Sequence, residues 1–415
     1  MIIKPTRYLL AMILLLSFEI VNAQTLGFKF INDQKRVRIP FELHNNLIVV
    51  PVILNNQLPL KFILDTGVRT TILTEKVYTD ILNLSYSKKY TISGIGSEAD
   101  QGLEAYITNG VSLTLPGIKG TGHAMLVLEE DYLQLRNYLG TDVHGIIGYE
   151  LFSRFVIKVD YDSKVLILTT PDHFHPSKKY KELNISVEDT KPYVKGSIQY
   201  PNDEKVDLKL MVDSGASQGL MLLPGSDKNL YIPENNLVCN LGRGLEGDLY
   251  GKVARLKKFE LGEQSWKDVI ATFPDENQKL DSIKGNTIFR NGSIGGGILS
   301  RFKVIFNFPE EKIYLKKGRS FKKDFGFNLS GLVVKAKGAR LDTYEIVEVR
   351  EGSVGENAGF KVGDIIIGID NIEKNKLNLG VILGALNSKV NRRVNLEVQR
   401  GGVKFSSRFR LKSPI

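Results

Sequence analysis

The chain has 415 residues, of which 42% are hydrophobic and 25% are charged, and its formal net charge is +10 at pH 7. This length suits two or three domains with apolar cores, and the single cysteine, Cys239, excludes a fold held by internal disulfides. The basic excess lies in residues 316–415, where 20 Lys and Arg face 10 Asp and Glu. Such a region is typical of a protein that binds an acidic partner, or of a basic surface that only faces solvent. The sequence has no nucleic-acid recognition motif, which argues against binding of nucleic acid.

Residues 1–23 predict a secretory signal peptide. Lys4 and Arg7 precede an uncharged apolar run at 8–16, and small residues then stand before Gln24. We therefore expect an exported protein of the periplasm, the cell envelope or the medium, with a mature chain that begins at Gln24. The apolar run is too short for a membrane span, and no other stretch is apolar over the length of a bilayer.

Two later apolar runs end in the same kind of motif. The run at 58–64 leads into Asp65-Thr66-Gly67, and the run at 206–212 leads into Asp213-Ser214-Gly215. Each run reads as a buried strand that leaves its Asp beside a loop, and each Gly allows a sharp turn there. Each strand is also the second arm of a predicted hairpin, with turns at 55–57 and 201–204.

The repetition continues further along the chain. Residues 147–155 align without a gap on residues 294–302, and both segments are followed by a strand, a polar turn and another strand. The chain therefore contains a two-fold internal repeat, with predicted lobes at 24–170 and 171–318.

These motifs resemble those of the aspartic proteases, both the two-lobed pepsin-like enzymes and the retroviral type. The resemblance implies a mainly β fold with two acid-protease β-barrel lobes and an active-site cleft between them. It makes Asp65 and Asp213 the catalytic pair. It also assigns support of the two loops to Thr66, Gly67, Ser214 and Gly215.

The chemistry of such a pair needs two carboxylates that share one proton. The ionised member takes a proton from water, while the protonated member polarises the peptide carbonyl. No metal or other cofactor is required. The expected partner is a peptide or protein substrate in the cleft, and a monomer suffices because one chain carries both motifs.

The sequence departs from the family in three places. Val68 and Ala216 stand where pepsin-like enzymes have a hydroxyl residue, which should leave the pair less acidic. Residues 293–295 match only in part the family's pattern of two apolar residues and a Gly, which 146–148 fits well. The candidate flap is a Gly-rich segment that consists of Ile92, Ser93, Gly94, Ile95 and Gly96. The alternative is that this segment forms an ordinary hairpin turn. Residues 241–244 are its equivalent in the second repeat.

Two other patterns in the sequence suggest different kinds of site. Residues 215–219 match a nucleophile-elbow pattern, but every His of the chain lies upstream of Ser217, which the α/β-hydrolase order does not allow. Asp172, His173 and His175 could ligate a metal, but they lack a third clustered ligand and fall between the lobes, which favours a solvated loop.

The C-terminal part, predicted as a domain over 319–415, resembles a PDZ domain of bacterial envelope proteases. The resemblance rests on Ala358-Gly359-Phe360-Lys361-Val362-Gly363-Asp364 and on strand-like runs around it. It places a carboxylate-binding loop at Phe325, Gly326, Phe327 and Asn328, where backbone N–H groups would hold the C-terminus of a peptide. The alternative is a packing module with a blocked groove.

The sequence thus predicts an exported aspartic endopeptidase whose PDZ domain binds the C-termini of substrates or partners. The alternative is a non-catalytic peptide-binding adaptor with a degenerate protease cleft.

Overall fold

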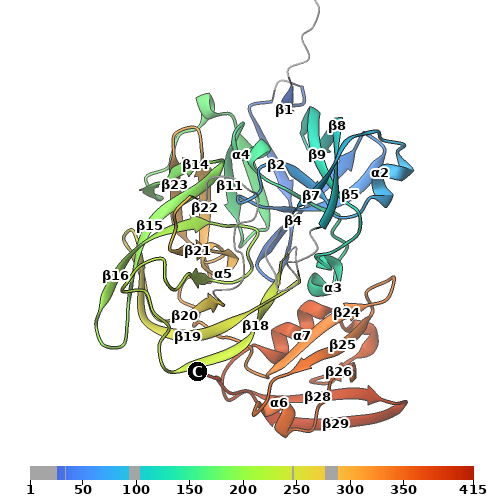
Figure 1. The fold of residues 1–415 in the computed structure, drawn as a ribbon, viewed down its shortest axis with the longest axis vertical. Helices are drawn as coiled ribbons and strands as arrows, with labels where there is room; N and C mark the ends of the chain where they lie inside the picture. The colour runs from blue at the N-terminus through green and yellow to red at the C-terminus, as the bar shows by residue number, and fades with distance from the viewer. Residues whose placement is uncertain (1–25, 33, 93–102, 245–246, 276–287) are drawn as a thin grey trace, which may run out of the picture.

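The computed structural model describes residues 26–32, 34–92, 103–244, 247–275 and 288–415 (Figure 1). This part of the chain is mainly β, as predicted, with four sheets and short helices. Residues 27–317 form three of the sheets, and residues 332–410 form the fourth. No helix within the described ranges is long and apolar enough to cross a membrane.

The first sheet belongs to the first half of the chain. Its strands are β1 (Gly27–Phe30), β3 (Glu42–His44), β4 (Leu47–Leu54), β5 (Leu58–Leu64), β6 (Thr71–Leu73), β7 (Tyr86–Ile92), β8 (Leu103–Leu115), β9 (Ile118–Leu128) and β10 (Gly145–Ile147). Asn55, Asn56 and Gln57 connect β4 to β5, and the φ angles of Asn55 and Asn56 are 50° and 57°, the left-handed geometry of a tight hairpin turn. The predicted turn is therefore confirmed.

The second sheet repeats this topology in the second half. Its strands are β14 (Ser186–Glu188), β15 (Lys191–Gln199), β16 (Lys205–Val212), β17 (Leu220–Leu222), β18 (Asn236–Gly244), β19 (Gly247–Leu261), β20 (Gln264–Pro274) and β21 (Gly292–Ile294). In the first half β5 runs parallel to β10, β10 antiparallel to β6, and β6 parallel to β9. In the second half β16, β21, β17 and β20 follow the same three relations.

A six-stranded sheet joins the two halves. It consists of β2 (Arg36–Pro40), β11 (Val156–Asp160), β12 (Val165–Thr169), β13 (Lys181–Asn184), β22 (Phe302–Asn307) and β23 (Lys312–Lys317). Its centre is the antiparallel pair β11–β22, where Val159 of the first repeat lies opposite Val304 of the second. One continuous apolar core extends from Phe28 to Leu315, so the two halves share a core instead of enclosing one each.

The C-terminal unit has a sheet and a core of its own. The strands are β24 (Leu332–Lys337), β25 (Thr343–Val349), β26 (Ile365–Ile369), β27 (Ile372–Glu373), β28 (Arg393–Arg400) and β29 (Val403–Arg410). Its separate core includes Ile346, Ile366, Ile382 and Leu396, all at most 1% exposed. A unit with its own core is expected to fold without the rest of the chain.

Short helices lie between the strands. They are α2 (Val77–Ile81), α3 (Leu135–Leu139), α4 (Tyr149–Phe152), α5 (Gly296–Leu299), α6 (Val354–Asn357), α7 (Leu379–Leu386) and the 3₁₀ turns η1 (Pro171–His173) and η2 (Lys374–Lys376). α4 and α5 occupy equivalent places, because each follows the short strand, β10 or β21, that pairs with an Asp-bearing strand. Ser353 and Asn378 cap α6 and α7 through their side-chain oxygens.

Candidate active site

Asp65 and Asp213 stand directly after β5 and β16, at equivalent places in the two halves. Each strand is buried throughout its last three residues, so its Asp is the first polar side chain beyond the core. The backbone N–H of Asp65 donates to the carbonyl of Ile147 at 2.8 Å. The N–H of Asp213 donates to the carbonyl of Ile294 at 2.9 Å. The two short strands β10 and β21 therefore hold the two aspartates in the same way.

The glycines that follow the aspartates allow the two loops to meet. A Cβ atom at Gly215 would lie 2.2 Å from Oδ2 of Asp65, which is far inside van der Waals contact. A Cβ atom at Gly67 would lie 3.1 Å from Oδ1 of Asp65 and 3.7 Å from Oδ1 of Asp213. The two carboxyl groups are half-buried, and each lies close enough to the other to act on its pKa through charge and hydrogen bonding.

Thr66 and Ser214 tie the two loops together by a reciprocal set of hydrogen bonds. Thr66 Oγ1 donates to the carbonyl of Val212 at 2.6 Å and accepts from the N–H of Ser214 at 2.9 Å. Ser214 Oγ donates to the carbonyl of Leu64 at 2.8 Å and accepts from the N–H of Thr66 at 3.0 Å. Each buried hydroxyl uses both its donor and an acceptor site, so the relative position of the two aspartates is over-determined.

Gly148 and Gly295 complete the two loops from below. A Cβ atom at Gly148 would lie 2.1 Å from the carbonyl oxygen of Asp65, and one at Gly295 would lie 2.6 Å from the carbonyl oxygen of Ala216. The segment 293–295 matches the family's pattern only in part, yet it takes the same structural place as 146–148. The close backbone approach explains why the Gly is present in both copies.

The environment of the pair favours a single shared proton. The pKa of Asp65 is raised to about 8, chiefly by burial and then by the neighbouring charge of Asp213. The N–H of Gly67 and the charge of Lys191 act in the opposite direction and lower it. Burial also raises the pKa of Asp213, but the charge of Arg290 and two backbone N–H groups oppose this shift. Within the pair, the charged form therefore has the stronger support at Asp213.

Arg290 is a residue of the site that sequence reasoning missed. It is 6% exposed, and its Nη1 donates to the sulfur of Met211, two residues before Asp213, at 3.0 Å. The parallel pairing of β16 with β21 brings it there from 77 positions along the chain, so no local motif could have indicated it. A buried cation beside one carboxyl makes the two otherwise similar aspartates unequal.

The predicted flap can be placed only at its base. Ile92 ends β7, whereas Ser93, Gly94, Ile95 and Gly96 lie outside the described residues. The equivalent segment of the second half, 241–244, belongs to β18.

The hairpin of β18 and β19 is attached to the first half. Arg243 Nε donates to the carbonyl of Tyr132 at 2.9 Å, and its Nη1 lies 3.1 Å from Oδ1 of Asp248. Asp248 also accepts from the hydroxyl of Tyr138 at 3.1 Å. The hairpin that corresponds to the second flap position is thus held by polar contacts to residues just before and within α3.

The four residues predicted as a carboxylate-binding loop of the PDZ domain lie between the second half and the C-terminal unit. Phe325 packs against the core of the two halves, with the guanidinium of Arg301 3.7 Å above the centre of its ring. Asn328 accepts from the N–H of Gly331 at 2.9 Å through its side chain. The ring of Phe325 is thus anchored to the second half by stacking on a cation, whereas the role of the backbone N–H groups of these residues stays a prediction.

The first half also covers the free edge of the C-terminal sheet. β24 is the edge strand, and α3 lies beside it (Figure 1). Asn137 Nδ2 donates to the carbonyl of Ala336 at 2.8 Å, and Nζ of Lys335 lies 4.1 Å from the ring centre of Tyr138. A peptide that extended this sheet would use the backbone groups of the same edge.

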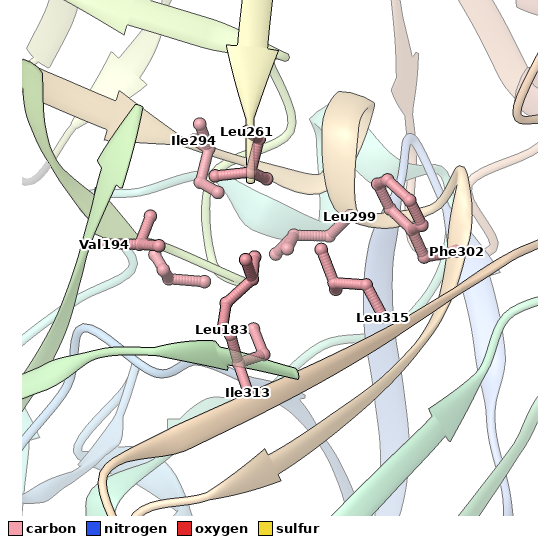
Figure 2. A pocket seen from close by; sticks show the side chains of 9 residues that line it. Leu183, Val194, Leu261, Ile294, Leu299, Phe302, Ile313 and Leu315 are labelled. Atoms are coloured by element: carbon pink, nitrogen blue, oxygen red, sulfur yellow. The ribbon is translucent and has the colours of Figure 1, made fainter. Parts of the chain in front are cut away.

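Nine apolar side chains converge on a small pocket in the second half (Figure 2). Val212 and Ile294, which precede the Asp213 loop and its supporting Gly, are among them, and no polar side chain joins them. This pocket is part of the core on which Asp213 stands. Among the residues that the structure describes, no group of three or more His, Cys, Asp or Glu side chains is arranged to hold a metal ion.

Comparison with protein families agrees with the geometry of both regions. Residues 50–151 match the model of an aspartyl protease family, and residues 345–400 match the model of a PDZ domain. The first match includes Asp65, whereas Asp213 lies beyond its end. A search of curated proteins finds no match to the chain. The chain thus combines an aspartyl protease domain with a C-terminal PDZ domain.

Proposed function

We propose that the chain is an exported aspartic endopeptidase that hydrolyses peptide bonds with Asp65 and Asp213. The observation that carries the proposal is the pair itself: two half-buried carboxyl groups that each act on the pKa of the other, on loops that Thr66 and Ser214 tie together. Export rests on the composition of residues 1–23 alone. The substrate is a peptide or an unfolded segment of a protein that lies over the pair.

Each carboxyl group has one part in the reaction. Asp213, whose charged form is favoured by Arg290, takes a proton from the attacking water, while Asp65 gives its proton to the oxygen of the scissile carbonyl. The hydroxide adds to the carbonyl carbon and forms a tetrahedral diol. As the C–N bond breaks, the proton on Asp213 passes to the leaving nitrogen and Asp65 recovers its own from the diol. The pair thereby returns to its starting state.

The proposal is tested by incubating the purified protein with a mixture of synthetic peptides and identifying the products by mass spectrometry. An endopeptidase yields paired fragments cut at internal bonds. If the peptides are bound but remain intact at every pH between 3 and 9, the adaptor interpretation holds and the proposed activity is wrong.

The pH profile is expected to reach neutral pH. Because burial raises the pKa of Asp65 to about 8, the singly protonated pair persists as pH rises and is lost only above that value. We therefore expect kcat/KM to be substantial at pH 7 and to fall on the alkaline side near pH 8. A profile confined to strongly acid pH would contradict this.

A matched variant checks the cause of that profile. Ala216 donates its N–H to Asp213 but has no hydroxyl, so the change Ala216→Ser would add a donor beside the carboxylate. A donor favours the charged form of Asp213, so the acid limb, where Asp213 takes up a proton, is expected to move to lower pH in this variant.

For the C-terminal unit, we propose a PDZ domain that binds peptides and whose strand edge is held by α3 in this conformation. The contact through Asn137 and Ala336 supports this, since the edge carbonyl is already an acceptor. Binding of a peptide there would require α3 to leave the edge. Five residues separate α3 from β10, which supports Asp65, so the helix that contacts the domain is joined to the support of the aspartate pair by a short stretch of chain.

Breaking this contact should loosen the edge of the sheet. A typical hydrogen bond contributes about 0.5–1.5 kcal/mol, so Asn137→Ala should speed hydrogen–deuterium exchange in β24 by a few-fold, up to about ten-fold. The isolated unit 319–415 should exchange at least as fast. Asn109→Ala, which removes an exposed amide of β8 far from this contact, is the control. Equal protection of β24 in all four proteins would show that α3 does not cover it.

A further inference from the structure

A second cavity lies on the six-stranded sheet, apart from the Asp65–Asp213 pair. Its volume is about 320 Å³, which is in the range of small-molecule sites. Its floor is apolar and comes from three neighbouring strands, with Val156 on β11, Ile167 on β12 and Ile305 on β22. The segment after η1 covers it with two aromatic rings, Phe174 and Tyr180, which pack against this floor.

Lys158 stands in the middle of this apolar floor. The register of the sheet places it directly opposite Ile167 on one side and Ile305 on the other. Burial lowers the pKa of Lys158, and its ammonium lies 5.6 Å from the ring centre of Tyr180. A half-buried charge is costly unless an opposite charge pairs with it.

No carboxylate of the described residues forms an ion pair with Lys158. The acid that faces it, Asp160 two residues further along β11, is already bound by Lys303 at 2.6 Å. Arg36 and Arg38 of β2 and Lys303 itself are the other charged groups that act on Lys158. Among the described residues, the one carboxylate whose charge acts on Lys158 is therefore already paired with another lysine.

The remaining lining is basic as well. Lys35 and Arg36 of the β2 edge, together with His173 and His175, line the cavity, and none of the lining residues is acidic. Thr169, Ser177 and the hydroxyl of Tyr180 add groups that can hydrogen-bond to an anion. His173 already shares its Nδ1 with Thr170 Oγ1 at 2.9 Å, which fixes its ring at the rim.

We propose that this cavity binds a small organic anion. The anionic group, a phosphate or a carboxylate, pairs with Lys158 and Arg36, and an apolar body lies against the rings of Phe174 and Tyr180 that line the cavity. Cations around an apolar, aromatic-walled cavity suit such an amphiphilic anion better than a bare inorganic one. Since β11 and β22 come from different halves of the chain, the ligand would lie where the two halves meet.

The test is calorimetric titration of the full chain at pH 7 with phenyl phosphate, benzoate, inorganic phosphate and benzyl alcohol. We expect saturable binding of phenyl phosphate or benzoate, at least ten-fold weaker binding of inorganic phosphate, and no binding of the neutral alcohol. The first two probes distinguish a phosphate site from a carboxylate site. No saturable binding of either aromatic anion at millimolar concentration would overturn the proposal.

Variants locate the binding. Lys158→Met keeps the length of the side chain and should weaken the binding of the preferred anion at least ten-fold, and Arg36→Gln should weaken it less. Lys195→Met, which neutralises an exposed lysine of β15, is the control and should bind as the wild type does.

Thermal unfolding checks that each variant is folded. Lys158→Met should have a Tm equal to or above that of the ligand-free wild type, because the variant no longer buries an unpaired charge. Unchanged affinity in a folded Lys158→Met variant would show that the anion binds elsewhere.

Discussion

Replacing Asp65 or Asp213 by asparagine should lower kcat/KM by about 10²–10⁴-fold or more while the protein stays folded. One carboxyl group cannot both remove a proton from water and donate one to the carbonyl. An asparagine retains the oxygen that accepts from the N–H of Gly67 or Gly215, so the loops should keep their shape. The measurement is kcat/KM on a peptide cut by the wild type, with Tm as the check of folding.

Asp207→Asn is the matched control for the Asp213 variant. Asp207 lies on the same strand, β16, but its side chain is exposed and away from the pair. The control should keep the activity of the wild type. If a folded Asp65→Asn or Asp213→Asn variant turns over peptide at the rate of the wild type, the pair does not perform the reaction.

The local part of this site could be predicted from the sequence. Asp65 and Asp213 each follow a strand whose last three residues are all buried, and the sequence shows such a strand end as a short unbroken apolar run. The Asn55–Asn56 turn was predictable for a similar reason, since Asn tolerates the left-handed geometry of a tight hairpin. Such patterns depend only on residues that are close together in the sequence. Because the sequence is repeated, each pattern of the aspartate loops occurs twice.

The parts that depend on long-range packing could not be predicted. Arg290 is brought to Asp213 by the pairing of β21 with β16, and an isolated Arg-Asn-Gly carries no sign of that pairing. The two halves also share one core and one six-stranded sheet, although a repeated sequence suggests two lobes that are each complete. Similarity between the two halves of the sequence reveals the repeat, but it does not reveal that strands of both halves form one sheet.

The C-terminal unit shows the same limit. Its family could be recognised from the Gly-Asp motif around Gly363 and Asp364, which shapes a turn within the unit itself. The position of Phe325 could not, because Arg301, from the second half, attracts its ring across the linker. Likewise, nothing within β24 indicates that Asn137 of the first half would donate to its edge. Motifs predict what a segment can form, and neighbouring segments decide what remains accessible.

Gly215→Ala should inactivate the enzyme almost as strongly as the loss of a carboxyl group. The new methyl group would sit 2.2 Å from Oδ2 of Asp65, so the Asp65 side chain or the whole Gly215 loop must shift. A displacement of about 1 Å in a catalytic group can cost about 10²-fold in rate. Because Thr66 and Ser214 clamp both loops from below, the loops cannot simply separate, and we expect Tm to fall as well.

Gly219→Ala is the control in the same loop. A Cβ atom at Gly219 would meet its nearest neighbour, Cγ1 of Ile298, at 3.7 Å, which is an ordinary contact. This variant should retain activity and Tm close to those of the wild type, although it makes the same chemical change four residues away. If the two variants lose activity equally, alanine harms the loop as such and the close approach of Gly215 to Asp65 is not the cause. If Gly215→Ala keeps the kcat/KM of the wild type, the two aspartates are not held at the separation on which the proposed proton sharing depends.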